Sequence, residues 1–198
     1  MFKNLKSIFN PKNKDIRSRI IFTLLALTIF AIGNTITVPG TKEITANLGF
    51  LEYLNAISGG GLKQFSIFGL GVMPYISASI VVGLLQMDII PYFSDLKNDG
   101  AKGRQKLNQI TRYMGIIVAF IQGVAMSIAF GISNNALDIM KTALIMTAGT
   151  AFLLWLGDQI TQKGIGNGIS LIIMAGIIST VPKMFIDTFS TFILDGNT

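Results

Sequence analysis

The stretch that decides the fold is SGGGLKQFSIFGLGVMPYISASIVVGLLQMDIIP, residues 58–91. After Ser58 it has three consecutive glycines, and it becomes an apolar run over residues 71–90 that stops at Pro91. A helix of about 20 apolar residues is long enough to cross the roughly 30 Å hydrocarbon core of a bilayer. The run also carries polar residues such as Ser79 and Gln86, which predict that one face turns toward protein or water.

The residues before this run are irregular for a membrane protein. Within residues 41–70 there is a moderately apolar part, residues 50–57, which is too short to span a bilayer. Irregular backbone at membrane depth is tolerated only where it lines a cavity or packs against protein, so this segment points toward a pore. An ordinary external loop explains the same feature about equally well.

The remaining apolar residues also come in long runs. Of the 198 residues, 51% are hydrophobic and only 13% are charged, which is a membrane composition. Further candidate spans lie at about residues 20–38, 113–130, 139–156 and 165–181. Pro182 should end the last of them. The sequence therefore predicts an all-α membrane protein of five transmembrane helices plus a re-entrant segment, preceded by a basic amphipathic tail at residues 1–19.

The basic residues agree with this topology. If the tail is cytoplasmic, cytoplasmic segments hold 12 of the 16 lysines and arginines: six in the tail, five in the loop after the second span, and Lys163. This excess satisfies the positive-inside rule, so we read the net charge of +6 as topology rather than nucleic-acid binding. An odd number of spans places the N-terminus in the cytoplasm and the end of this chain outside. A following copy of the unit would then enter inverted, and the polar ending at residues 194–198 is what we expect of a fragment.

Little catalytic chemistry is available to this chain. Cysteine and histidine are absent, which excludes disulfides, thiol redox chemistry, most zinc sites and every triad with a histidine base. The glycine pairs at residues 69–71 and 164–166 lack the third glycine of a dinucleotide fingerprint. Asp158 lacks both a Gly-x-Gly-Asp context and the second buried aspartate that intramembrane proteolysis needs. We therefore predict no enzyme, no catalytic residue, no metal and no cofactor.

Seven short motifs resemble the SecY family in order and spacing. They are SGGGL (58–62), SIF (66–68), GVMPYISASI (71–80), GRQK (103–106), TRY (111–113), WLGDQIT (155–161) and GIGNGIS (164–170). In SecY proteins ten helices form two inverted halves around an hourglass pore. The resemblance covers essentially the whole chain and implies that it supplies helices one to five. The implied function is the N-terminal half of a channel that translocates secretory polypeptides and releases membrane proteins laterally.

The resemblance also assigns a role to four branched side chains. This half's share of the hydrophobic pore ring would be Val72, Ile76, Ile169 and Ile173. Branched apolar side chains around a constriction exclude water and ions by dewetting, yet they yield sideways to a passing polypeptide. Their four-residue spacing is also what ordinary lipid-facing or interhelical packing would give.

Three further groups follow from the same resemblance. The plug that seals the closed pore from outside would be the segment at about residues 50–63, with Phe50, Ile57, Ser58, Gly59, Gly60, Gly61 and Leu62. One lip of a lateral gate would carry Ile80 and Gln86. The loop after the second span holds the basic residues Lys102, Arg104, Lys106 and Arg112. This loop would either touch cytoplasmic partners or anchor topology, and the charge rule favours anchoring.

By resemblance, the location is the bacterial cytoplasmic membrane and the protein partners are SecE, SecG, and SecA or the ribosome. The channel would also meet signal peptides, unfolded polypeptides, lipid, and the missing C-terminal half or a second copy. Two rivals stay open. Half of a secondary transporter would place ionisable groups near the bilayer midplane, whereas Asp88, Asp158 and Lys163 sit at predicted span ends. A self-dimerising, insertase-like half-channel would show a self-associated pair with a hydrated groove.

Overall fold

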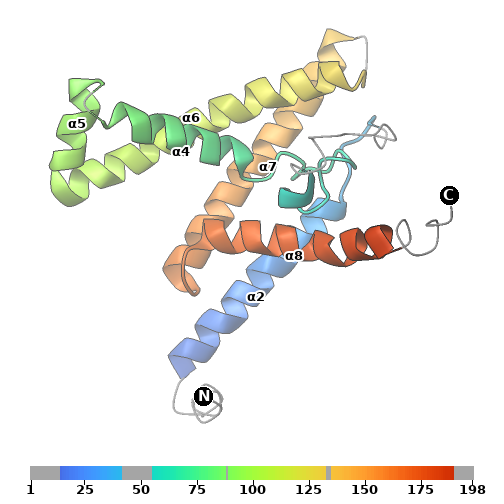
Figure 1. The fold of residues 1–198 in the computed structure, drawn as a ribbon, viewed down its shortest axis with the longest axis horizontal. Coiled ribbons are helices and arrows are strands. Elements are labelled where there is room, and N and C mark those ends of the chain that lie inside the picture. The colour runs from blue at the N-terminus through green and yellow to red at the C-terminus, as the bar shows by residue number, and fades with distance from the viewer. Residues whose placement is uncertain (1–13, 42–54, 88, 133–134, 190–198) are drawn as a thin grey trace.

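The computed structural model describes residues 14–41, 55–87, 89–132 and 135–189. The principal helices, in chain order, are α2 (Lys14–Thr35), α4 (Met73–Leu85), α5 (Pro91–Asn98), α6 (Gly100–Ala129), α7 (Ala136–Lys163) and α8 (Gly168–Phe189) (Figure 1). Within these ranges there is no β-strand, only one isolated bridge between Thr37 and Ser66. The predicted all-α class is confirmed.

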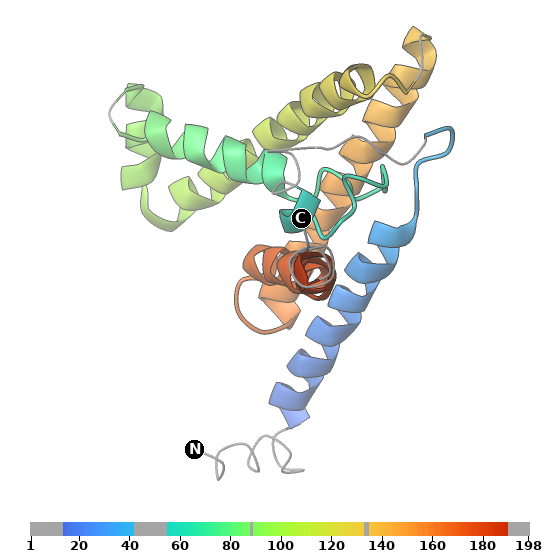
Figure 2. The same ribbon diagram turned by 45° about the vertical axis from the view of Figure 1, so that its right-hand side comes forward.

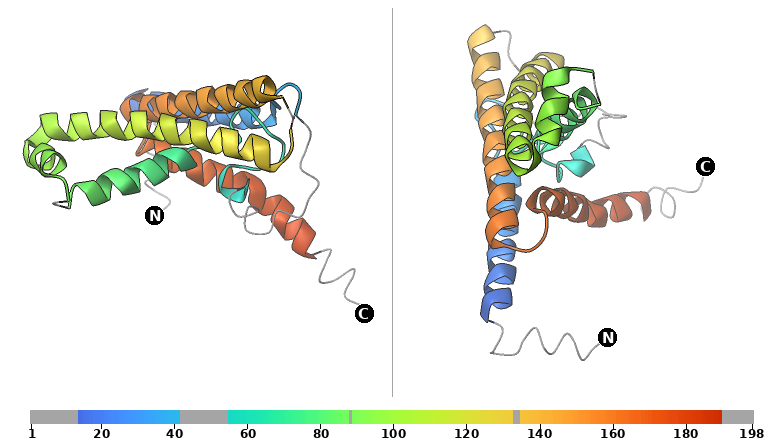
Figure 3. Two further views of the ribbon diagram at one scale, coloured as in Figure 1. Left: turned by 90° about the horizontal axis from the view of Figure 1, so that it is seen from above. Right: turned by 90° about the vertical axis from the view of Figure 1, so that its left-hand side faces the viewer.

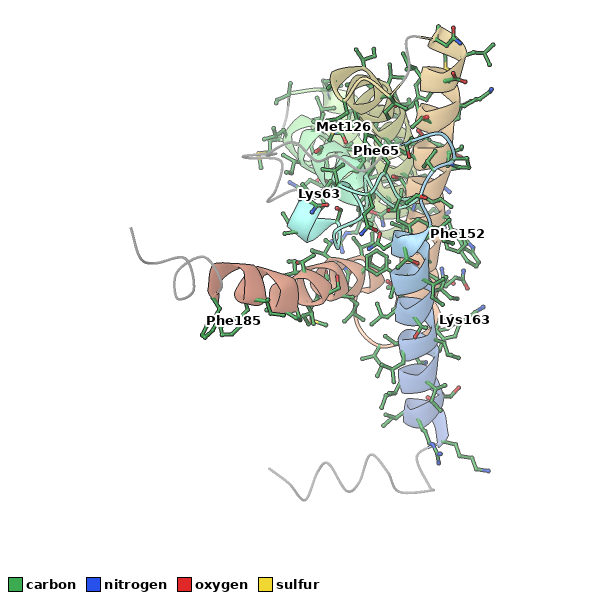
Figure 4. All side chains as sticks on the ribbon, turned by 90° about the vertical axis from the view of Figure 1, so that its right-hand side faces the viewer. Lys63, Phe65, Met126, Phe152, Lys163 and Phe185 are labelled. Atoms are coloured by element: carbon green, nitrogen blue, oxygen red, sulfur yellow. The ribbon has the colours of Figure 1, made fainter. Side chains whose placement is uncertain are left out.

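Helix α7 is the centre of the bundle. It packs against α6, α2 and α8, while α4 and α5 pack on α6. Figure 3 shows α2 and α7 running side by side and α8 projecting away from them. No other described helix therefore packs on the far end of α8, and Phe185, labelled in Figure 4, is 70% exposed there.

Three helices are long and apolar enough to cross a membrane: α2 with 22 residues, α6 with 30 and α7 with 28. Two shorter apolar helices accompany them, α4 with 13 residues and the part of α8 that ends at Pro182. At about 1.5 Å per residue, α4 is only about 20 Å long and does not match the bilayer core by itself. The chain is a multi-pass membrane protein.

The basic stretch predicted to be a loop is helical, so that prediction was wrong. Helix α5 and the start of α6 occupy it, and α6 carries Lys102, Arg104, Lys106 and Arg112. Lysine, arginine and glutamine are good helix formers, so a hydrophilic composition does not prevent a helix. Leu96 and Leu107 also bury with Val82 of α4 in one small cluster, and this contact gives the helical stretch an apolar face to pack.

The end of the last helix was also predicted wrongly. Pro182 lies inside α8, which continues to Phe189. A proline removes one backbone hydrogen bond from a helix, and membrane helices tolerate this where nearby hydroxyls and neighbours compensate. The hydroxyls of Ser179 and Thr180 donate to the carbonyls of Gly176 and Ile177, at 2.7 and 2.9 Å, and reinforce the turn before the proline. They do not replace the bond to the carbonyl of Ile178, which a proline at residue 182 cannot make.

Other helix ends differ less from the predicted span limits. Helix α2 begins inside the predicted tail, α4 ends at Leu85 rather than near residue 90, and α7 continues to Lys163. Polar flanking residues extend a helix beyond its apolar part, so apolar runs underestimate α2 and α7. Residues 1–13, with most of the predicted amphipathic tail, and Phe50 lie outside the described residues.

Gly149 and Gly83 form a matched pair for testing this packing. A Cβ at Gly149 would overlap the carbonyl oxygen of Ile67, whereas a Cβ at Gly83 would meet nothing within 4 Å. We expect Gly149→Ala to destabilise the fold by about 1–3 kcal/mol, because backbone atoms must move apart. Gly83→Ala should be neutral or stabilise by up to about 1 kcal/mol. Thermal unfolding in detergent measures both, and an equal response of the two variants would contradict the close contact.

Candidate functional site

Residues 55–71 form a chain of turns between α2 and α4, which we call the turn segment. Its second half, residues 62–71, is fixed to the residues that follow α2. The amide of Val38 donates to the carbonyl of Phe65 at 2.8 Å, and the amide of Ile67 donates to the carbonyl of Ile36 at 2.9 Å. Figure 2 shows the turn segment in teal where it leads into α4 beside α7. The chain thus returns from the end of α2 into the interior of the bundle.

The first half of the turn segment, residues 55–61, approaches α8 closely because it ends in three consecutive glycines. Gly59 and Gly60 have φ of +77° and +83°, a conformation that other residues rarely adopt. A Cβ at Gly59 would lie 3.2 Å from the Cα of Gly176 in α8. The hydroxyl of Thr180 in α8 also donates to the carbonyl of Ala56 at 3.4 Å. Side chains larger than hydrogen would push the segment off α8.

The four predicted pore-ring residues belong to one hydrophobic cluster. Val72 is 3% exposed and lies in the buried part of this cluster, which also contains residues of α2, α7 and α8. Ile76, Ile169 and Ile173 are half-buried and pack against it. A stack of aromatic rings supports the cluster, with Phe68 parallel to Phe30 at 6.4 Å and to Phe152 at 5.7 Å between centroids.

The described plug candidates lie together where the turn segment meets α2 and α8. We call this region, with the hydrophobic cluster beside it, the junction. Ser58, Gly61 and Leu62 are buried, while Ile57, Gly59 and Gly60 are half-buried. The two gate candidates, in contrast, are not brought together by α4. Ile80 is 60% exposed, and the side chain of Gln86 folds back so that Nε2 donates to the carbonyl of Val82 at 3.1 Å.

An ion pair that was not predicted joins α6 to α7. The guanidinium of Arg112 lies 2.5 Å from the carboxylate of Asp158, whose side chain is 19% exposed while that of Arg112 is 43% exposed. Sequence reasoning had placed the two residues separately, one in a loop and one at a span end. The available signal was that opposite charges flank two neighbouring apolar helices.

A second contact missed from the sequence is made by Asn34. Its Nδ2 donates to the carbonyl of Ser58 at 3.0 Å, inside the bundle. The signal was its position as the one strongly polar interruption of the first predicted span. The sequence shows that Asn34 interrupts the apolar run, but it does not show which group Asn34 bonds.

The basic residues at the start of α6 are exposed. Lys102, Arg104 and Lys106 point outward, and Lys106 Nζ lies 5.9 Å from the centroid of the Tyr92 ring in α5, a cation–π contact. Over the described part of the chain, no group of three metal-ligating side chains comes together. What the junction offers chemically is an apolar cluster with a glycine-rich segment beside it.

Comparison with known proteins identifies relatives of this chain. The model of the SecY family matches residues 66–197. A protein translocase subunit SecY of Staphylococcus epidermidis is 49% identical, covering 92% of this chain and 45% of its own length. That of Staphylococcus aureus is 48% identical, covering 94% of this chain and 46% of its own length. The chain therefore spans about half the length of the curated relatives it matches.

Solved channel structures share the fold. Sec61 in the canine ribosome-channel complex from the endoplasmic reticulum superposes with a TM-score of 0.68 at 22% identity, over 91% of this chain and 42% of the other. A structure described as a protein conducting channel gives the same values. A structure on the SecY plug domain gives a TM-score of 0.63, also at 22% identity, over 90% of this chain and 38% of the other.

The Arg112–Asp158 pair should stabilise the α6–α7 contact. Because the pair is only partly screened from water, we expect a double-mutant cycle of Arg112→Gln and Asp158→Asn to give a coupling energy of about 1 kcal/mol. The exposed pair Lys141–Asp138, three residues apart in α7, is the control and should give less than about 0.5 kcal/mol. Unfolding in detergent measures both cycles. Equal coupling energies would contradict the expectation that the interhelical pair stabilises the fold more than an exposed pair within one helix does.

Proposed function

Because the chain belongs to the SecY family, we propose that it forms the N-terminal half of a protein-conducting channel in the bacterial cytoplasmic membrane. The observation that carries this proposal is the junction itself. Four branched residues in α8 and at the start of α4 share one apolar cluster, and a glycine-rich segment packs beside them. A single half can supply only part of a ring, so the remaining side chains would come from a second half.

The proposed constriction consists of Val72, Ile76, Ile169 and Ile173. The partial exposure of Ile76, Ile169 and Ile173 supports the role, because a ring residue must keep one side free to meet the passing chain while its other side is held; Val72, which is buried, would hold the base of the ring. Branched apolar side chains cannot hydrogen-bond water, so a narrow ring of them stays dry and blocks ions. The ring can part without breaking any polar contact of its own.

The proposed plug is the region at about residues 50–63, of which the first half of the turn segment is described. It would seal the closed constriction from the outside. Glycine at residues 59–61 supports this role, because Gly59 and Gly60 can approach α8 closely and Gly61 leaves room for Asn34 and Ser66. The proposed lateral gate uses the exposed face of α4 at Ile80, with Gln86 at the end of that helix.

The proposed orientation has the N-terminus in the cytoplasm and the end of this chain outside. The exposed basic residues of α6 then lie on the cytoplasmic side, in agreement with the positive-inside rule. The far end of α8, on which no other described helix packs, is available to a second half. The further proposed partners are SecE, SecG, and SecA or the ribosome, which would supply the energy that a channel without catalysis lacks.

Neither rival gains an observation of its own. A secondary transporter needs ionisable groups free to bind coupling ions, but Asp158 is already paired with Arg112. A self-dimerising half-channel needs a hydrated groove, and the junction described above is apolar.

Ile76→Asp tests the proposed constriction. A charge at that position would wet the ring, so we expect the full-length protein, reconstituted in planar bilayers, to leak ions at rest at least about tenfold more than the parent. Ile76→Leu keeps the apolar volume and serves as the control, which should stay closed. Resting conductance of Ile76→Asp equal to that of Ile76→Leu would remove Ile76 from the constriction.

A further inference from the structure

We propose that Asn34 is a latch that holds the first half of the turn segment, residues 55–61, in its seat, while the second half is a fixed anchor. The proposal deepens and rests on the proposed function, since it says how the segment assigned as the plug is retained and released. It follows from the different ways in which the two halves of the turn segment are held.

The second half is held by the backbone and by large buried side chains. Its main chain pairs with that of Ile36 and Val38, and the hydroxyl of Thr150 in α7 donates to the carbonyl of Gly71 at 3.2 Å. Phe65 is 1% exposed and packs edge-on against Phe130. Figure 4 shows Phe65 beside Met126, within this core. Releasing this half would expose aromatic surface and break several backbone hydrogen bonds together.

The first half is held differently, through side chains of neighbouring helices. Asn34 Nδ2 donates to the carbonyl of Ser58 at 3.0 Å, and Thr180 reaches the carbonyl of Ala56 at 3.4 Å. The Thr180 hydroxyl also donates to Ile177 at 2.9 Å, so it is shared. The hydrogen bond from Asn34 is therefore the stronger of these two links to the rest of the bundle.

Two buried polar atoms beside the first half lack hydrogen bonds within the described residues, and this lowers the free-energy cost of releasing that half. Among the described residues, neither Asn34 Oδ1 nor Ser66 Oγ has a hydrogen-bond partner, and both residues are buried, at 7% and 0% exposure. Both atoms face the space beside Gly61, where a Cβ would overlap Ser66 Oγ and lie 2.7 Å from Asn34 Oδ1. Leaving buried polar atoms unpaired raises the free energy of the seated state. Movement of the segment would let water reach both atoms.

The backbone also has a flexible point, Gly59 and Gly60, directly after the residue that Asn34 holds. Gly59 and Gly60 lie next to Ser58, and both have positive φ. Glycine reaches other conformations at little cost, so residues 55–58 can swing while the anchored half stays in place. This movement would also break the bonds that the amides of Gly60 and Lys63 donate to Asn55, at 2.8 and 2.9 Å. The bond from Asn34 to Ser58 lies on the moving side of this flexible point.

The test uses the absence of cysteine from this chain, with any cysteine in the rest of the full-length protein replaced by serine. Ser58→Cys is placed in the full-length protein, in proteoliposomes, and its reaction rate with a water-soluble maleimide is measured. Asn34→Leu removes the donor with little change in volume, and we expect it to speed labelling about threefold to tenfold, the range for one net hydrogen bond. Gly61→Ala, which crowds the same space, should also speed labelling.

Two controls make the result decisive. Thr28→Leu makes a similar change on an exposed face of α2, where the hydroxyl donates to the carbonyl of Leu24 in its own helix, and should leave labelling unchanged. Ser127→Cys, fully buried in α6, reports general loosening. Unchanged labelling of Ser58→Cys in Asn34→Leu overturns the latch, as does equal acceleration at Ser127→Cys. Labelling requires no conduction, so the latch can fail while Ile76→Asp still leaks, and the reverse.

Discussion

The close approach of the turn segment to its neighbouring helices is the contact on which the rest of the site depends. Irregular backbone inside a membrane protein must have its polar groups bonded to protein, because lipid offers no partners. Residues after α2 provide those bonds to the second half, and glycines allow the contact, with Gly149 under Ile67 and Gly59 against Gly176. Without this seat α4 would not begin where it does, and Val72 would not reach the apolar cluster.

Much of this fold follows from the apolar runs and the glycines. The spans near α2, α6, α7 and α8 were predictable because length and composition dictate them in a bilayer. Two errors have physical causes: the basic stretch is helical because it packs on α4, and Pro182 is accommodated within α8. Pairings such as Arg112 with Asp158 depend on how helices are set against each other, which periodicity along one helix does not contain.

The candidate site combines parts that resist change with parts that permit it. The aromatic stack around Phe68 and the backbone pairing of the second half of the turn segment are rigid supports. The parts that we propose to move are the half-buried isoleucines and the glycine-rich half, because glycine changes conformation at little cost. A channel that must stay sealed and still open for a wide substrate requires this division, because packed cores shift between discrete arrangements rather than deforming continuously.

The central claim is that Ile76 and Ile169 face a translocating polypeptide. Single cysteines at these positions, with one at the 60% exposed Ile117 of α6 as a lipid-facing control, would be crosslinked to a stalled secretory chain in the full-length protein. This chain has no cysteine, and replacing any cysteine in the rest of the full-length protein makes every adduct site-specific. The proposed channel predicts adducts at Ile76 and Ile169 and none at Ile117. Absence of adducts at both positions, in correctly inserted protein, would contradict the assignment of this junction as the pore.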